Sequence, residues 1–222
     1  MKEKNVFLVL LLAVLLISGC GGGGSSPPPA GIIRYGVQII SNGFNGNPSN
    51  NYVAMAFAVI DGQTLDADIS VNDTRIPVDN NEISIGLLNP GDQVSVSITH
   101  PKLSVSATLR VPGIPEYITE TADLNNWFHS MPRIPLIITW TDEYSKMHKS
   151  DVYIKDEKNT IIAQESWKTT SNQMVIDETK SASLLSTPGA AKVMVRVYGY
   201  DEYIDTAHDS DITIVGESVD IE

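Results

Sequence analysis

Apolar and polar residues alternate along most of the chain beyond position 31. In QVSVSIT, residues 93–99, valine or isoleucine occupies every second position, and LSVSATLRV, residues 103–111, has the same pattern. Strict alternation in short runs predicts strands with one face in a core and one in solvent. Turn-forming pairs such as Asp61-Gly62 separate the runs. We expect seven strands here, which favours a β-sandwich; they lie near 34–40, 52–60, 67–71, 75–78, 82–87, 93–99 and 103–111.

The alternation stops at VPGIPEY, residues 111–117, where two prolines flank Gly113. Such a segment is typical of a domain boundary. Residues 117–133 have no firm pattern, and a long loop or a first strand with a short helical turn would both fit. Alternation then resumes, and six further strands are expected in SDVYIKD, TIIAQE, QMVID, KVMVRVYGY, DITIV and ESVDIE, after a strand at LIITW. We therefore predict an all-β fold of two tandem immunoglobulin-like antiparallel sandwiches, over residues 32–112 and 113–222.

The second half resembles a fibronectin type III or related immunoglobulin-like domain over roughly residues 115–222. LIITWT matches the second strand of that family with its core tryptophan, SDVYIKD the third strand, and LLSTPGAAKVMVRV the approach to the sixth. The family carries a corner tyrosine just before the last alternation, where this chain has Ala191. LLNPGDQVSVSITHP in the first half has a similar plan, which suggests tandem copies; chance similarity of two Pro-Gly turns is the competing explanation.

The first twenty residues follow another pattern. Lys2 and Lys4 precede an uncharged apolar run from Val6 to Ile17. Because about 20 apolar residues are needed to span a bilayer, this shorter run predicts the apolar region of a signal peptide. The segment from Ile17 to Cys20, Ile-Ser-Gly-Cys, resembles a bacterial lipobox. The resemblance implies cleavage after residue 19 and lipidation of Cys20, and it implies anchoring in the cell envelope.

The segment that follows the lipobox predicts a tether. Residues 21–31, GGGGSSPPPAG, combine flexible Gly and Ser with prolines that favour an extended chain. With Cys20 they would hold the folded part near a membrane. Gly21 stands where an inner-membrane retention signal of that family has Asp, so the resemblance favours the outer membrane, on its periplasmic face or at the cell surface.

Composition excludes several classes of function. The formal net charge of -12 argues against nucleic-acid binding, which requires clustered Lys and Arg. A single cysteine excludes an intramolecular disulfide and a cysteine-cluster zinc site. The chain also lacks the common nucleophile, phosphate-loop and zinc-protease motifs. Its four histidines, His100, His129, His148 and His208, are scattered. We expect no enzyme and no catalytic residue.

The densest polar cluster is YGYDEYIDTAHDSD, residues 198–211, and we expect its carboxylates to crowd a loop between the last strands. Carboxylates at short spacing are the ligands that calcium prefers, although the spacing of an EF-hand is missing. A solvated acidic hairpin loop is the favoured interpretation, and a calcium site is the alternative. The carboxylates are those of Asp201, Glu202, Asp205, Asp209 and Asp211.

Four aromatic residues are candidates for ligand contact: Trp127 and Phe128 in the irregular segment, and Tyr200 and Tyr203 beside the acidic cluster. Exposed aromatics stack on sugars or anchor protein partners. Ordinary packing is the alternative for each. The leading hypothesis is a lipid-anchored, non-catalytic envelope module that binds another protein or acts as a spacer. The alternative is carbohydrate binding, with calcium assistance at the acidic cluster.

Overall fold

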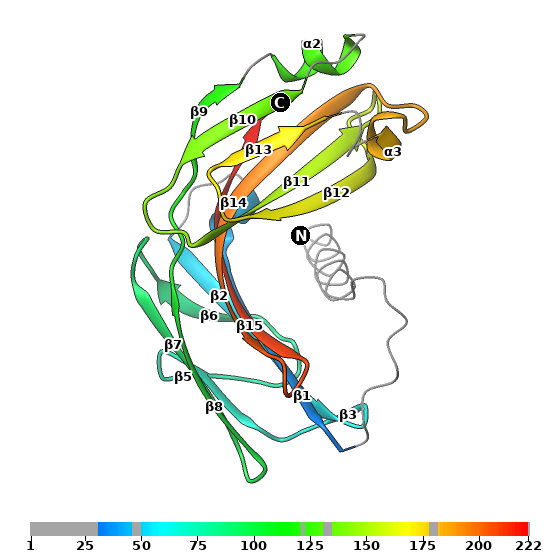
Figure 1. The fold of residues 1–222 in the computed structure, drawn as a ribbon. Helices are drawn as coiled ribbons and strands as arrows, with labels where there is room; N and C mark the ends of the chain where they lie inside the picture. The colour runs from blue at the N-terminus through cyan, green and yellow to red at the C-terminus, as the bar shows by residue number, and fades with distance from the viewer. Residues whose placement is uncertain (1–30, 46–49, 121–122, 131–134, 178–181, 222) are drawn as a thin grey trace. The chain divides into compact units, whose positions relative to one another are not determined.

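The structure is a computed structural model, and it describes residues 31–45, 50–120, 123–130, 135–177 and 182–221. Strands dominate these residues, and the helical segments are short: η1 (Asn42–Asn45), α2 (Leu124–His129) and α3 (Ala182–Leu185). The predicted all-β fold is confirmed (Figure 1). Ile33–Glu222 form one compact unit. The predicted signal peptide, Cys20 and the tether up to residue 30 lie outside the described residues.

The strands of the described residues form three sheets. The largest has eight strands in the order β12-β11-β14-β15-β1-β2-β3, with β6 also paired to β2; these are β1 (Ile33–Ser41), β2 (Asn51–Ile60), β3 (Gln63–Thr64), β6 (Ile83–Leu87), β11 (Met147–Lys155), β12 (Ile161–Thr169), β14 (Lys192–Asp205) and β15 (Ser210–Ile221). A four-stranded sheet has the order β5-β4-β7-β8, from β4 (Asp68–Val71), β5 (Thr74–Ile76), β7 (Gln93–His100) and β8 (Leu103–Arg110). A three-stranded sheet has the order β13-β10-β9, from β9 (Glu116–Glu120), β10 (Leu136–Thr141) and β13 (Gln173–Ile176).

The alternation of the sequence locates these strands well. The seven strands expected in the first half differ from the observed bounds by no more than two residues at either end. The two-residue β3 was not expected. In the irregular segment, β9 and α2 agree with the second alternative, a strand followed by a short helical turn.

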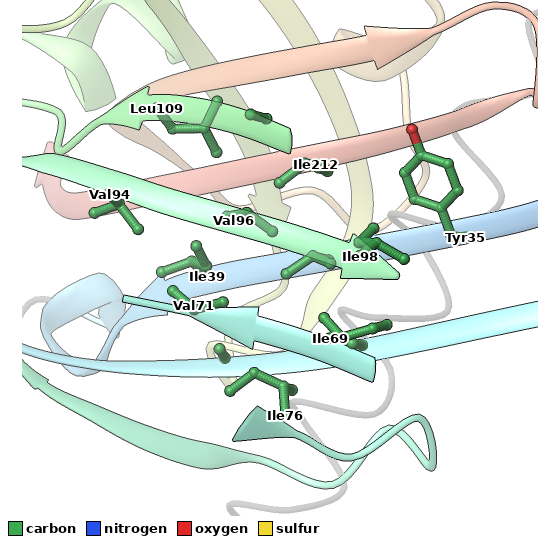
Figure 2. Close-up of a cluster of buried hydrophobic side chains, with 14 of the residues drawn as sticks. Tyr35, Ile39, Ile69, Val71, Ile76, Val94, Val96, Ile98, Leu109 and Ile212 are labelled. Carbon is green, nitrogen blue, oxygen red and sulfur yellow. The ribbon is translucent and has the colours of Figure 1, made fainter. Parts of the chain in front are cut away.

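The first core lies between the eight-stranded and four-stranded sheets (Figure 2). Along β8 the apolar residues are buried and the intervening Ser, Thr and Arg residues are exposed, as the alternation predicts. Tyr35 and Ile39 of β1 face this core, and both are 0% exposed. Ile212 from the far end of the chain is also a member (Figure 2).

The second core lies between the three-stranded sheet and the other end of the eight-stranded sheet. Trp140 of β10 and Val195 of β14 belong to it, and α2 covers it with Leu124, Trp127 and Phe128. Asp123 caps α2, because its Oδ1 accepts the backbone N–H of Asn126 at 2.8 Å.

The β14–β15 hairpin connects the two cores. β15 pairs with β14 along both of its halves, with Ile212 opposite Tyr203 and Val219 opposite Val197. The N-terminal half of β15 pairs in parallel with β1, with Ile212 beside Val37 and Ile214 beside Ile39. Tyr198 and Tyr200 are opposite Ser218 and Val215, so β15 carries one extra residue in a bulge. Because of this extra residue, the side chains that face the cores are at even positions before the bulge, such as Ile212, and at odd positions after it, such as Ile221. The apolar residues of β15 therefore face both cores from the same side of the sheet.

This arrangement differs from two self-contained sandwiches in tandem. DITIV, which we expected to serve only the second half, supplies Ile212 and Ile214 to the first core. DITIV and ESVDIE are one strand rather than two. The loop expected around the carboxylates at 201–211 is also wrong for most of its length, because β14 continues to Asp205 and β15 begins at Ser210.

The shared hairpin makes a testable prediction about stability. Ile214 is 0% exposed. The substitution Ile214→Ala should therefore lower the free energy of unfolding by about 2–5 kcal/mol, because it leaves a cavity in the first core. The matched control is Ile204→Ala on the same hairpin, where the side chain is 58% exposed and the change should stay within about 0.5 kcal/mol. Urea denaturation of both variants measures the difference. Equal effects of the two substitutions would contradict the shared core.

Candidate functional site

The segment at Pro112-Gly113 connects the two cores, and it passes over the eight-stranded sheet at two glycines, Gly199 and Gly216. A Cβ built on Gly199 of β14 would lie 2.9 Å from the Pro112 Cβ, and one on Gly216 of β15 would lie 3.1 Å from the same atom. Both distances are shorter than ordinary packing contacts. The segment at Pro112-Gly113 approaches the sheet this closely only because these positions have no side chain.

A buried carboxylate beside this crossing organises the segment that follows β10. Oδ1 of Asp142 accepts the backbone N–H groups of Tyr144 and Ser145, each at 3.0 Å. Oδ2 of Asp142 accepts the Ser145 hydroxyl and lies 3.1 Å from Nε2 of His148. Ser145 Oγ in turn accepts the backbone N–H of Gly113 at 3.1 Å. The side chains of Asp142 and His148 are 0% and 1% exposed, so this network is shielded from water.

The network decides the charge of Asp142. Burial alone would raise the pKa of this carboxyl, but the hydrogen bonds from His148 and Ser145 and from the backbone N–H groups together lower the pKa below its usual value. Asp142 is therefore a carboxylate at neutral pH. The Ser145 hydroxyl donates to this carboxylate and not to an imidazole, so Ser145 is not activated by a histidine as a nucleophile.

A second buried carboxylate, that of Asp201, also holds the two halves together. Asp201, which is 3% exposed, lies on β14 and accepts the backbone N–H of Arg110 in the first half at 2.9 Å. It also accepts the ammonium of Lys146 at 3.0 Å, from the segment that follows Asp142. We name Asp142, Ser145, His148 and Asp201, with the Gly113 backbone, the junction cluster.

Sequence reasoning did not find most of the junction cluster. The sequence presents His148 only as one of four scattered histidines, and Asp201 only as one of several neighbouring carboxylates. The available signal was local: Asp142 followed by Ser145 at i+3 is a spacing at which a carboxylate accepts backbone N–H groups in a turn. The contacts with Gly113 and Arg110 have no local signal.

Four of the five carboxylates proposed as calcium ligands have cationic or hydroxyl partners of their own, while partial burial and the nearby charges of Glu202 and Asp209 raise the pKa of the fifth, Asp211. Asp201 pairs with Lys146 and Glu202 with Lys168 at 3.1 Å. Asp205 accepts the Tyr35 hydroxyl at 2.8 Å and lies 2.6 Å from Nδ1 of His208. Asp209 pairs with Arg34 at 2.7 Å, and Asp211 lies at the start of β15. Among the described residues, no group of three or more His, Cys, Asp or Glu side chains is placed to hold a metal ion.

The four aromatic candidates are not gathered on one exposed face. Trp127 and Phe128 are 2% and 4% exposed and lie in the second core, where α2 carries them. Tyr200 is 5% exposed, and only Tyr203, at 37%, is well exposed. Tyr200 and Tyr203 also point to opposite sides of β14, because they are an odd number of residues apart. These residues therefore do not form a flat aromatic platform.

A polar cluster lies on the side of the eight-stranded sheet that faces away from the cores. Arg196 of β14 donates from Nε and Nη2 to the carboxylate of Asp220, at 2.7 and 2.8 Å, and its guanidinium lies over the Tyr153 ring. Ser166 of β12 donates to Asp151 of β11 at 2.5 Å. These bonds tie β11, β12, β14 and β15 together, which is a structural role.

The chain was compared with known proteins: no protein-family model matches it, and no curated protein matches it. Within the described residues, no helix is long and apolar enough to cross a membrane.

The lowered pKa of Asp142 predicts a pH dependence. The unfolded chain binds a proton at this carboxyl near pH 4, whereas the folded chain binds it only at lower pH. Stability from Asp142 is therefore fully present above about pH 5 and is lost as pH falls through the folded pKa. Asp142→Asn should cost about 3 kcal/mol at pH 7 and should flatten the loss of stability between about pH 5 and 3. Urea titrations at several pH values measure both effects.

The control for this prediction is Asp73→Asn, at an exposed turn position where Asn also adopts the positive φ of 64°. It removes a carboxylate without touching the junction cluster and should leave the stability at pH 7 within about 0.5 kcal/mol. A pH profile of Asp142→Asn with the original steepness would show that Asp142 is not the group responsible.

Proposed function

We propose that this chain is a lipid-anchored protein of the bacterial cell envelope, with a non-catalytic β-domain that binds another protein or acts as a spacer. The proposal of an anchor rests on the lipobox at residues 17–20 and the tether that follows. A diacylated cysteine gives stable membrane attachment, which a single chain does not. The outer membrane is the favoured location, because the residue after Cys20 is Gly21 and not the Asp of an inner-membrane retention signal.

The observation that supports the proposal for the β-domain is that both of its cores belong to one compact unit. Residues 33–222 are one compact unit, because the β14–β15 hairpin belongs to both cores and the junction cluster fixes the connection between them. Domains joined only by a flexible linker move independently. A domain with two cores and one continuous sheet keeps its ends at a fixed separation, which suits a spacer or a rigid platform for a partner.

We further propose that the second half is a fibronectin type III-like or related immunoglobulin-like domain. Counted from β9, its first, second and fifth strands form one sheet, and its third, sixth and seventh strands are neighbours in the other. That division of strands between sheets is the one used by immunoglobulin-like sandwiches. Trp140 lies on the second strand and is buried in the second core, as the resemblance implies.

The surface proposed for a protein partner is the side of the second half formed by β12 and β13. Each is the last strand of its sheet among the described residues, so each has an unpaired edge. Ile162 on β12 is 38% exposed and Val175 on β13 is 40% exposed. Unpaired edges with exposed apolar side chains favour a partner that adds an extended segment to the sheet.

The anchor is tested by replacing the lipidated residue. Cys20→Ala should move the protein from the detergent phase to the aqueous phase in a phase-partitioning assay, because the acyl chains have no other attachment point. Ser26→Ala in the tether is the control and should remain in the detergent phase. A Cys20→Ala chain that still partitions into detergent would rule out the lipid anchor.

The binding surface is tested separately. Ile162→Asp with Val175→Asp should reduce crosslinking to envelope proteins by at least about tenfold if each substitution removes about 1 kcal/mol of apolar contact. Leu87→Asp, at the most exposed of the large apolar residues described, is the control, since it lies on β6 of the first half. Crosslinking that is unchanged in the double variant but lost with Leu87→Asp would place the partner on the first half.

A further inference from the structure

Three polar atoms of the second core have no hydrogen-bond partner in the part of the chain that the structure describes: Nε1 of Trp140, Nδ1 of His148 and Oγ of Ser150. Their residues are 3%, 1% and 1% exposed, so bulk water does not reach them. Buried polar groups in folded proteins are nearly always hydrogen-bonded, to protein or to ordered water. Three such atoms in one core therefore require an explanation.

The three atoms belong to one corner of that core. His148 and Ser150 are two residues apart on β11, so their side chains project from the same face, which is also the face of Val152 and Ile154 in the core. Trp140 projects from β10 on the opposite sheet, and its ring meets the His148 ring edge-on at 5.4 Å between centroids. The corner lies next to the junction cluster, because His148 is a member of both.

The chemistry of the three atoms restricts what can occupy the corner. The Trp140 indole N–H can only donate. Nε2 of His148 donates to the Asp142 carboxylate, and in a neutral imidazole this leaves Nδ1 as an acceptor. The Ser150 hydroxyl can do either. With a neutral imidazole, an occupant must accept from Trp140 and donate to His148, which a metal cation or a simple anion cannot do.

We propose that an internal water molecule occupies this corner, accepting from Trp140 Nε1, donating to His148 Nδ1 and making a third hydrogen bond with Ser150 Oγ. Three partners are the usual number for a buried water. The water extends the junction cluster: hydrogen bonds then run from the Gly113 N–H through Ser145, Asp142 and His148 to Trp140. The connection between the two cores is thereby linked to the interior of the second core.

The experiment is a water-selective NOE and ROE measurement on the ¹⁵N-labelled full chain. The Trp140 indole proton, assigned by its loss in Trp140→Phe, should show cross-peaks to water of opposite sign in the two spectra, which marks a dipolar contact rather than exchange. Ser150→Ala should keep these cross-peaks, because it removes only the hydroxyl, which could relay exchange. Ser150→Val should abolish them, because its methyl groups fill the corner. Long-range ¹H–¹⁵N spectra should show His148 protonated at Nε2 only.

Ser106→Val is the matched control, since Ser106 is exposed on β8 and its substitution should leave the cross-peaks unchanged. A resolved Trp140 indole signal without a water cross-peak in the unsubstituted chain would overturn the proposal. A proton on His148 Nδ1 at neutral pH would also overturn it, as would loss of the cross-peaks in Ser150→Ala. Should Ser150→Val fail to fold, the unsubstituted chain and Ser150→Ala still decide the question.

Discussion

The parallel pairing of β15 with β1 is the interaction on which the rest of the structure depends. It brings Ser210 to Tyr35, whose backbone N–H donates to the serine Oγ at 2.9 Å across 175 positions of sequence. It also places Ile212 and Ile214 against the first core. The same strand continues into the second core, so one row of backbone hydrogen bonds determines that the two cores share a sheet. The bulge near Gly216 is needed for this, because a regular strand would turn one set of apolar residues to the wrong face.

The junction cluster explains how so close a crossing is stabilised. The glycines at 199 and 216 remove steric obstruction, and the two carboxylates then supply directional bonds: Asp142 orders the segment after β10, and Asp201 bonds to Arg110 and Lys146. Burial makes these bonds stronger and makes an unmatched partner costly. The connection is therefore specified by polar contacts more than by apolar ones, and the proposal of a rigid spacer depends on them.

The sequence predicted the strands well where each has one wet and one buried face, as in β7 and β8, because alternation is a local signal. It could not predict that DITIV pairs with β1, since parallel pairing between distant segments leaves no mark on either segment. The carboxylates at 201 and 205 looked like a loop because their partners, Arg110 and Tyr35, are far away in sequence. Trp127 and Phe128 lie on a helix of six residues, which is too short to show a helical period. The junction cluster could not be predicted for the same reason, because its contacts with Arg110 and Gly113 join residues that are far apart in sequence.

The place of β15 in the first core also sets the order in which the protein can fold. During synthesis the residues of β1 to β8 emerge long before those of β15, and chain segments generally fold as they appear. Here the first core lacks part of its wall until β15 is available, because Ile212 and Ile214 belong to that core. Contacts of such large sequence separation also form slowly. The first core is therefore incomplete until β15 has been made, whereas the core of an independent first sandwich could close as soon as β8 was available.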